Sequence, residues 1–502
     1  MKIQDANQLS SRTMHSDICI IGAGPAGLTL AGALVPTGRD ILIADSGGRR
    51  FEKEPDELNA MQTDSNFLYR NGRSNRARQT GGSAALWAGR VVPFDFHPDL
   101  DREWSELPSA IVPHFDEAFR LLNIEPDIRN DHEHQPGELY GYWANRTQRF
   151  RTMVSGTRNG NCSLFNHLTC IGEPEFDGDR LKSLVFLNQK MERIRISAGR
   201  FIFAMGGIEN SRMLLLMREQ IEKRLGEHFG NVGKYVMDHP RISHGRIVPK
   251  GSTSEITRYL MKVTPRGMYK TGIRNHPVHT RAYCNIMVIP GKLTRRVMRL
   301  PARSFQVSSK KLLLKEAGLL RTLASQGRLL PVLSGTDPVS SRIMRFVNNR
   351  SYSTYKMMAY CEQRPRAHNR IIIGTDTDRN AQPVARLCNH LHPEELYDIE
   401  SLYRRMEKHA GILNCTFSWD PEFVNNPANY TDASHIIGGT RYSGDASRAV
   451  VDHRLSVFGI PNLYITGSSV FPTSGVENPT HLIIALSLRL AGILKEDVAK
   501  YC

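Results

Sequence analysis

The sequence has few cysteines, and none of them forms a recognisable motif. The eight are scattered along 502 residues, at positions 19, 162, 170, 284, 361, 388, 415 and 502. No two have the CxxC spacing, and no CxxCH haem motif occurs. This pattern argues against a disulfide scaffold, a zinc or iron–sulfur site and attached haem, so we predict no metal. It is typical of a reduced, cytoplasmic protein.

Long apolar runs are also missing. The chain contains no run of about 18 apolar residues, and residues 1–16 lack the apolar core of a signal peptide. We therefore expect no membrane span and no secretion signal. Its 40% hydrophobic and 23% charged residues are typical of a folded globular protein. A chain of this length suits two joined domains better than one core.

The net charge of +16 is concentrated in one segment, residues 291–350, which holds thirteen Lys and Arg against two acids. Within it, residues 310–330 have the pattern of an amphipathic basic helix. Three roles stay open: a lid or oligomer contact, a solvated face, or a surface for anions such as membrane lipid or a phosphorylated substrate. Nucleic acid is disfavoured because the segment lacks interleaved aromatic residues.

A βαβ unit is predicted near the start of the chain. Asp17–Ile21 and Asp40–Ala44 are expected as strands, with Pro25–Leu34 as a small-residue helix between them. The turn before the helix is Gly22-Ala-Gly-Pro-Ala-Gly27, whose glycines let backbone N–H groups approach a pyrophosphate. Asp45 ends the second strand and can bind both ribose hydroxyls, which favours FAD or NAD over NADP. The alternative is a glycine turn that only packs a helix on a sheet.

The rest of the chain supports a discontinuous arrangement. Strand, glycine and helix patterns recur near Arg200–Met217 and again at the C-terminal end, where His481–Leu494 is expected as a helix. We predict an α/β fold in which a Rossmann-type domain is built from residues 14–95, 150–240 and 435–502. Residues 96–149 are expected to connect it to an inserted α+β substrate domain with an antiparallel sheet, 241–434, which contains the basic segment.

Several motifs in this order resemble the glucose–methanol–choline (GMC) family of FAD-dependent oxidoreductases. Besides the first glycine turn they are Gly81–Arg90 (GGSAALWAGR), Ala204–Arg212 (AMGGIENSR), Gly233–Pro240 (GKYVMDHP), His435–Thr440 (HIIGGT) and Gly467–Pro479 (GSSVFPTSGVENP). The sugar-oxidising branch, which includes pyranose oxidase-like enzymes and aminoglycoside alcohol dehydrogenases, is the most similar. Residues 245–360 match weakly.

The resemblance implies an FAD site. The residues that it assigns to the cofactor are Gly22, Gly24, Pro25, Ala26, Gly27, Asp45, Ser46, Gly81, Gly82, Ser83, Trp87, Ala88, Ala204, Gly206, Gly467, Ser468, Asn478, Pro479 and Thr480. Some sugar oxidases of the family attach FAD through a histidine just before the loop tryptophan. Here that position is Leu86, so we predict noncovalent FAD.

The resemblance also assigns the chemistry. Alcohol oxidation by hydride transfer needs a base for the hydroxyl proton, and histidine suits that task near neutral pH. His435 is the expected base, and Asn478 its neutral partner that orients the substrate oxygen. Asn478 before Pro479 can instead be a helix N-cap. The neighbouring Glu477 touches substrate or flavin in one interpretation and faces solvent in the other, whereas His239 and His481 are expected to be structural.

The expected reaction is FAD-dependent oxidation of a CH–OH group in a sugar-like or glycosidic substrate to a ketone or aldehyde. The alternatives are oxidation of a sterol or other hydrophobic alcohol within the same family, a nicotinamide-linked dehydrogenase, and a protein without catalytic activity. Oxygen or a quinone is expected as electron acceptor. No nucleic-acid partner is expected, and membrane or oligomer contacts through residues 291–350 stay open.

Overall fold

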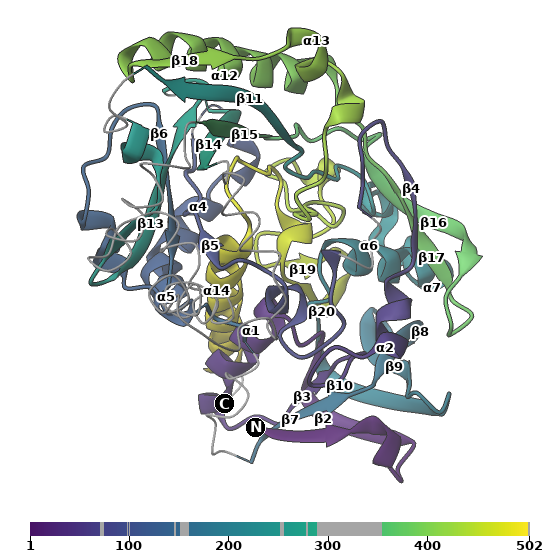
Figure 1. The fold of residues 1–502 in the computed structure, drawn as a ribbon. Coiled ribbons are helices and arrows are strands. Elements are labelled where there is room, and N and C mark those ends of the chain that lie inside the picture. Colours follow the sequence, from purple (N-terminus) through teal and green to yellow (C-terminus); the bar gives the residue numbers. More distant parts are fainter. Residues whose placement is uncertain are drawn as a thin grey trace, which may run out of the picture.

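The computed structural model describes residues 1–70, 75–97, 99, 101–144, 147–150, 160–250, 256–277, 280–288 and 354–499. These residues form two large sheets and one small sheet (Figure 1). The predicted α/β class is confirmed: one large sheet is mainly parallel and comes from discontinuous segments, and the other is antiparallel. The basic segment 291–350 lies outside the described residues, so the alternatives for it stay open.

The nine-stranded sheet draws on the start, the middle and the end of the chain. Its main order is β1-β7-β3-β2-β10-β20-β19, and a β8–β9 hairpin pairs with β10. From β1 to β20 the neighbouring strands are parallel. Parallel strands are covered on both faces, which explains fully buried runs such as Ile41–Ala44. The strands are β1 (Lys2–Asp5), β2 (Thr13–Ile21), β3 (Ile41–Ala44), β7 (Cys162–Asn166), β8 (Thr169–Asp177), β9 (Arg180–Leu187), β10 (Arg193–Phe203), β19 (Ser456–Val457) and β20 (Ile460–Ile465).

The first and last long helices pack together beside this sheet, α1 (Pro25–Leu34) against α14 (Thr480–Ala499) (Figure 1). The predicted bounds of α1 match the structure, and α14 extends the predicted helix at both ends. The remaining helices here are α2 (Lys53–Asp56), α4 (Leu107–Ile111), α5 (Phe115–Leu121), α6 (Gly207–Leu216) and α7 (Arg218–Leu225). No helix among the described residues combines the length and apolar character needed to cross a membrane.

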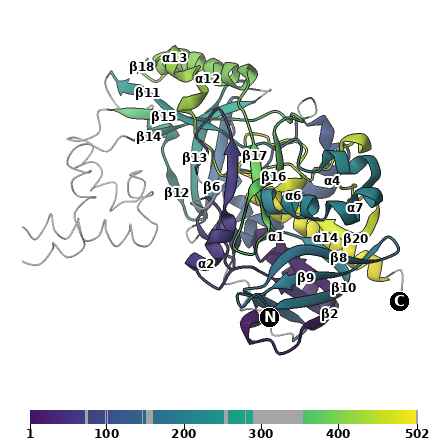
Figure 2. The same cartoon turned by 90° about the vertical axis from the view of Figure 1, so that its right-hand side faces the viewer.

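The eight-stranded sheet is antiparallel, in the order β18-β11-β15-β14-β13-β6-β5, with β12 paired to β13. Figure 2 shows α12 (Pro393–Ile412) and α13 (Pro421–Val424) along its outer side. Two strands come from outside residues 241–434: β5, and β6 from the segment that we expected to be only a connection. The strands are β5 (Arg90–Val91), β6 (Glu138–Trp143), β11 (Arg241–Pro249), β12 (Lys262–Thr264), β13 (Gly267–Arg274), β14 (Ala282–Val288), β15 (Tyr355–Cys361) and β18 (Cys415–Ser418).

A three-stranded sheet joins distant segments beside the two large sheets. Its order is β16-β17-β4, with β16 (Arg370–Thr377), β17 (Pro383–Cys388) and β4 (Met61–Asp64). Helix α6 contacts both β16 and β17. The small sheet therefore joins the region after the first βαβ unit to the segment that follows β15.

Candidate active site

A cavity of about 830 Å³ extends from the first glycine turn to one face of the eight-stranded sheet. Its size lies within the range of small-molecule and cofactor sites. Both the Gly22–Gly27 turn and the His435 segment contribute to its wall. The two regions that carry the sequence motifs, more than 400 positions apart, thus meet at one site.

The glycine turn at one end of the cavity leaves room for a cofactor backbone. Gly22 has a positive φ of 108°, and a side chain there would collide with the Ala204 carbonyl at 2.5 Å. A side chain on Gly24 would instead meet nothing within 4 Å, and Gly24 caps the start of α1 beside the cavity. Open space at a helix N-terminus suits a pyrophosphate. The cradle therefore fits the dinucleotide that the sequence predicts.

Asp45 is held in place by the same turn. One carboxylate oxygen accepts a hydrogen bond from Ala23 N–H at 2.7 Å and the other from Gly47 N–H at 2.9 Å. Burial raises the pKa of Asp45, while these two bonds oppose the shift. The carboxylate lines the cavity next to Ser46. Its position agrees with the expected ribose contact.

An ion-pair network at this end was missed by the sequence motifs. Glu209 is buried and pairs with Arg76 at 2.9 Å, Arg78 at 3.2 Å and Arg212 at 3.1 Å. The three guanidinium groups hold the pKa of Glu209 far below its ordinary value despite burial. Asp378 adds a 2.7 Å pair to Arg212. Of these residues, the motif Ala204–Arg212 (AMGGIENSR) contains only Glu209 and Arg212. The other partners lie far away in the sequence, so the network could not be predicted from it.

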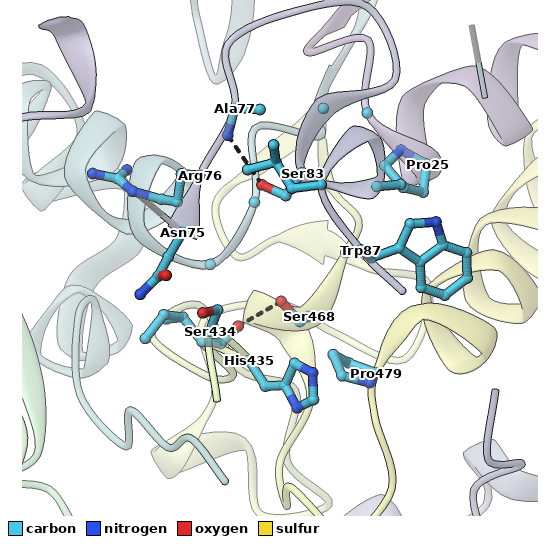
Figure 3. Close-up of a pocket in the computed structure, with 18 of the residues that line it drawn as sticks. Pro25, Asn75, Arg76, Ala77, Ser83, Trp87, Ser434, His435, Ser468 and Pro479 are labelled. Atoms are coloured by element: carbon cyan, nitrogen blue, oxygen red, sulfur yellow. Dashed lines mark hydrogen bonds between the residues drawn. The ribbon is translucent and has the colours of Figure 1, made fainter. Parts of the chain in front are cut away.

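Two loops face each other across the middle of the cavity. Figure 3 shows Pro25, Ser83 and Trp87 on one side, with Ser434 and Ser468 opposite. A side chain on Gly82 would come within 3.0 Å of the Gly24 Cα, so the loop that contains Gly82 closes directly onto the glycine turn. Pro479 and Thr480 also line the cavity, which places the N-terminal end of α14 at its edge.

Most residues predicted for the cofactor line this cavity, but Gly27 and Gly81 do not. A side chain on Gly27 would strike the Gly22 carbonyl at 2.0 Å, so this glycine allows α1 to pack on the turn. Gly81 has a φ of 95° and donates a hydrogen bond from its N–H to the Ala23 carbonyl. The residues that do line it are Gly22, Gly24, Pro25, Ala26, Asp45, Ser46, Gly82, Ser83, Trp87, Ala88, Ala204, Gly206, Gly467, Ser468, Asn478, Pro479 and Thr480.

His435 is the histidine in the cavity wall, and a second histidine supports it from behind. The Nδ1 atoms of His435 and His239 lie 2.9 Å apart. On the far side of its ring, His239 Nε2 lies 3.2 Å from the Ser474 carbonyl and 2.9 Å from the Gly475 carbonyl. We expected a structural role for His239. Its direct contact with His435 adds a hydrogen bond that the sequence did not predict.

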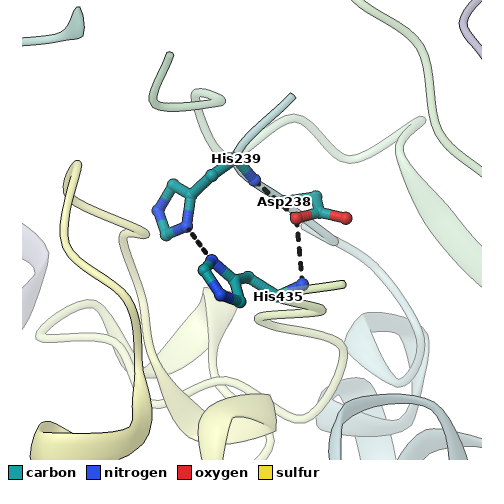
Figure 4. A group of neighbouring side chains, drawn as sticks. All are labelled: Asp238, His239 and His435. Carbon is teal, nitrogen blue, oxygen red and sulfur yellow. Dashed lines mark hydrogen bonds between the residues drawn. The ribbon is translucent and has the colours of Figure 1, made fainter. Parts of the chain in front are cut away.

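Asp238 ties the two histidine segments together (Figure 4). One oxygen, Oδ1, accepts hydrogen bonds from the backbone N–H of His435 at 3.0 Å and of His239 at 2.6 Å. The other, Oδ2, accepts from the Tyr69 hydroxyl at 2.7 Å. Burial and the nearby Asp432 raise the pKa of Asp238 to about 6. The backbone that carries both rings is thereby fixed.

The hydrogen-bond partners determine the tautomers of the pair. Two carbonyl oxygens can only accept, so His239 Nε2 must carry a hydrogen. Neutral His239 then has a lone pair on Nδ1, and His435 must donate from its own Nδ1. This leaves the lone pair of neutral His435 on Nε2, which has no hydrogen-bond partner among the described residues. The ring therefore offers a proton acceptor at that atom.

Both rings are neutral near pH 7. Burial lowers the pKa of His239 to about 4. Burial also lowers the pKa of His435 well below its ordinary value, and the nearby His239, Arg241 and Arg90 lower it further. A histidine that is neutral before the reaction can accept a proton during it.

The pair and Asp238 offer three potential ligand atoms within 4.8 Å of one another. The nitrogens of two imidazoles on one tetrahedral zinc ion would be ~3.3 Å apart, given metal–nitrogen distances of about 2.0–2.1 Å. The observed 2.9 Å between the Nδ1 atoms is instead an ordinary hydrogen-bond length. The geometry favours a hydrogen-bonded histidine pair.

Asn478 lines the cavity, but its side chain is engaged by the backbone. Its Oδ1 accepts from Val92 N–H at 3.0 Å, and its Nδ2 donates to the Arg90 carbonyl. We expected this amide to orient a substrate oxygen or to cap α14. Its contacts instead fasten the last turn before α14 to the chain at β5.

Glu477 and His481 lie behind the cavity wall. Glu477 is 4% exposed, and its carboxylate accepts a hydrogen bond from Val476 N–H at 2.9 Å. It does not line the cavity, so neither expected role, toward substrate or toward solvent, fits. Burial raises its pKa to about 8. His481 is buried against Phe115, as expected of a structural histidine.

Known proteins with similar sequences and folds point to one class. The family described as GMC oxidoreductase matches residues 365–487. The fructose dehydrogenase large subunit of Gluconobacter japonicus is 20% identical, covering 98% of this chain and 99% of its own length. The 6'''-hydroxyparomomycin C oxidase of Streptomyces lividus is 27% identical over 150 residues, 25% of this chain and 27% of its own length.

Solved structures agree on the fold. Formate oxidase from Aspergillus oryzae RIB40, as the R554A variant, superposes with a TM-score of 0.58 at 15% identity, covering 98% of this chain and 100% of that one. Pyridoxine 4-oxidase from Mesorbium loti gives the same TM-score at 13% identity, over 95% and 98% of the two chains. The chain therefore shares the fold of these two oxidases. The chain is similar to GMC oxidoreductases over residues 365–487, and over nearly its full length to the fructose dehydrogenase large subunit.

Proposed function

We propose that this protein oxidises an alcohol group of a sugar-like or glycosidic substrate to a ketone or aldehyde, with His435 as the base. The observation that carries the proposal is the histidine pair, because it leaves a lone pair on the Nε2 of a neutral histidine in the cavity wall. The names of two relatives, a fructose dehydrogenase and a hydroxyparomomycin oxidase, support the sugar-like class.

The residues have distinct tasks in this mechanism. FAD, when bound, supplies the hydride acceptor. His435 Nε2 takes the hydroxyl proton, and the resulting imidazolium keeps its Nδ1–H bond to His239. His239 acts as a positioning residue, since its two carbonyl partners fix which nitrogen accepts. The N-terminal end of α14, at Pro479 and Thr480, adds a positive potential at the cavity edge.

Noncovalent FAD is part of the proposal. Leu86 lines the cavity at the position where some relatives have a linking histidine, and its side chain has no nucleophile. The residues proposed to hold FAD are those of the glycine turn, Asp45, the Gly82–Ala88 loop and the Gly467–Ser468 turn. Cytoplasmic location, and oxygen or a quinone as the acceptor, are further parts of the proposal.

A hydrophobic substrate is less well supported. Arg90, Arg241 and Lys270 line the cavity on the face of the antiparallel sheet. Burying a sterol against three cationic side chains would remove their water without replacing its hydrogen bonds. A polar, hydroxyl-rich substrate does not incur that cost.

The test is anaerobic mixing of the FAD-loaded protein with a panel of sugars, glycosides and sterols. The proposal expects a sugar or glycoside to bleach the visible flavin band and to yield one carbonyl product per flavin reduced. Reduction by sterols alone, or release of the flavin only after proteolysis, would contradict the substrate class or the noncovalent attachment respectively. A protein that no alcohol reduces would contradict the proposed oxidation itself.

A further inference from the structure

One wall of the cavity is a single face of the antiparallel sheet. Paired residues of neighbouring strands point to the same side, and the register places the lining residues in phase: Arg90 opposite Trp143, Tyr283 opposite Tyr360 and Asn285 opposite Met358. Lys270 faces the same way, because it pairs with Gly141, two residues before Trp143. The lining residues on this face are Arg90, Trp143, Arg241, Lys270, Tyr283, Asn285, Met287, Met358 and Tyr360.

The wall carries positive charge without matching negative charge. Arg90, Arg241 and Lys270 form no ion pair within 4.0 Å with any carboxylate that the structure describes. The acids that line the cavity are Asp45, Glu209 and Asp378, and all three lie at the dinucleotide end. There Glu209 and Asp378 are neutralised by arginines, and Asp45 binds backbone N–H groups. The sheet end of the cavity is therefore electropositive.

Gly141 makes the close approach of two cations possible. A side chain on Gly141 would meet Arg90 Nε at 2.3 Å, so the guanidinium group lies over this strand position. Lys270 is the residue directly paired with Gly141 on the next strand. Arg90 and Lys270 thus become neighbours across a residue without a side chain, and Arg90 adds to the effect of burial in lowering the pKa of Lys270.

Several donors of this pair are unused. Arg90 donates from Nη1 to the Tyr283 hydroxyl at 2.7 Å, while its Nε and Nη2 are buried and have no partner among the described residues. The Lys270 ammonium donates to the Ile286 carbonyl at 2.7 Å and has two further hydrogens, one of which approaches the Met287 sulfur at 3.7 Å. Burial, with the repulsion from Arg90, lowers the pKa of Lys270 to about 8. Two half-buried like charges with free donors repel each other, and an anion that joins them would relieve this repulsion.

We propose that the substrate is an anionic sugar, whose carboxylate or phosphate binds at Arg90 and Lys270 while its alcohol group reaches His435. This inference rests on the proposed function for the oxidation step, but the anion site itself does not. The Arg90 guanidinium lies over the rings of Trp143 and Tyr283, and Tyr283 stacks on Tyr360, so this aromatic group holds the cation at the cavity wall. A cationic sugar would be repelled here.

The test compares three hexoses that differ only at C6: D-glucose, D-glucuronate and D-glucose 6-phosphate. Acetate and acetamide are compared as a second pair, because they are similar in size and differ in charge. This pair tests the anion site without a sugar. Dissociation constants are measured on the FAD-loaded protein at low ionic strength, from perturbation of the flavin spectrum and competition between ligands. We expect acetate and at least one anionic hexose to bind about 10- to 100-fold more tightly than their neutral counterparts.

Substitutions of Lys270 and Arg90 test whether these two side chains form the anion site. Lys270→Met and Arg90→Gln should each remove most of this preference, whereas Lys182→Met, at an exposed strand residue that does not line the cavity, should keep it. The anion site is overturned if neutral ligands bind as tightly as anions, or if both cavity variants retain the preference. Preference for D-glucuronate identifies a carboxylate and preference for D-glucose 6-phosphate a phosphate. Anion binding without reduction of the flavin by any sugar would instead contradict the proposed oxidation and leave the anion site standing.

Discussion

Replacing His239 tests the link between a remote side chain and the base. In His239→Leu the acceptor for the His435 Nδ1–H disappears, so His435 can move its hydrogen to Nε2 and lose its lone pair there. Losing one buried hydrogen bond costs about 1–3 kcal/mol, which corresponds to flavin reduction about 5- to 150-fold slower. We expect the decrease in the limiting rate of flavin reduction at saturating substrate. The substrate concentration that gives half of the limiting rate should change little.

His239→Asn is the matched variant, because the asparagine Oδ1 occupies nearly the place of the histidine Nδ1 and can accept the same hydrogen bond. It should recover most of the rate that His239→Leu loses. His228→Leu is a control for the loss of an imidazole elsewhere, since His228 stacks on Phe458 outside the cavity. The assay is anaerobic stopped-flow reduction, normalised to bound FAD. Equal rates for His239→Leu and the wild type, or equal losses in the Leu and Asn variants, would refute the tautomer argument.

Two further predictions concern Glu477 and Asn478, the two residues before Pro479. Glu477 has a folded-state pKa of about 8 against an ordinary value of 4.5, so the folded protein holds a proton that the unfolded chain releases. The free energy of unfolding should therefore fall by up to about 1.4 kcal/mol per pH unit as pH rises through this window and level off above it. Glu477→Gln should remove that fall in urea titrations at several pH values; parallel curves for the two proteins would contradict the buried protonated carboxyl. Asn478→Leu leaves the Val92 N–H and the Arg90 carbonyl without their partner, which should lower the free energy of unfolding by about 1–3 kcal/mol. If this variant unfolds like the wild type and loses only reduction rate, Asn478 serves the substrate instead of the backbone.

The parts of the fold that the sequence predicts are those with local signals. The strand before the glycine turn, the turn and the following helix are predicted from neighbouring residues: the predicted Asp17–Ile21 lies within β2, and the predicted Pro25–Leu34 agrees with α1. The antiparallel sheet was expected in 241–434, but β5 and β6 join it from before residue 144. The residue pattern within a strand does not indicate which distant strand it pairs with. The pairing of β5 and β6 with the antiparallel sheet therefore could not be predicted from the sequence.

The candidate site likewise has parts with local sequence signals and parts that depend on contacts between distant segments. The motifs include His435 and most of the predicted cofactor residues that line the cavity, because family resemblance acts on short segments. The contact between His239 and His435 joins positions 196 residues apart, and only the packed structure reveals it. The contact between the Asn478 amide and the backbone near β5, 386 residues earlier in the chain, could not be predicted for a related reason.

The most direct measurement is the rate of anaerobic flavin reduction in His435→Ala compared with the wild type, using the best sugar substrate and equal bound FAD. General-base catalysis contributes about 100- to 10,000-fold, so the variant should be slower by a factor in that range. A second prediction of the same measurement is that raising the pH restores part of the lost rate, because hydroxide can replace the missing base. A variant that reduces its flavin as fast as the wild type would contradict His435 as the base and with it the proposed mechanism.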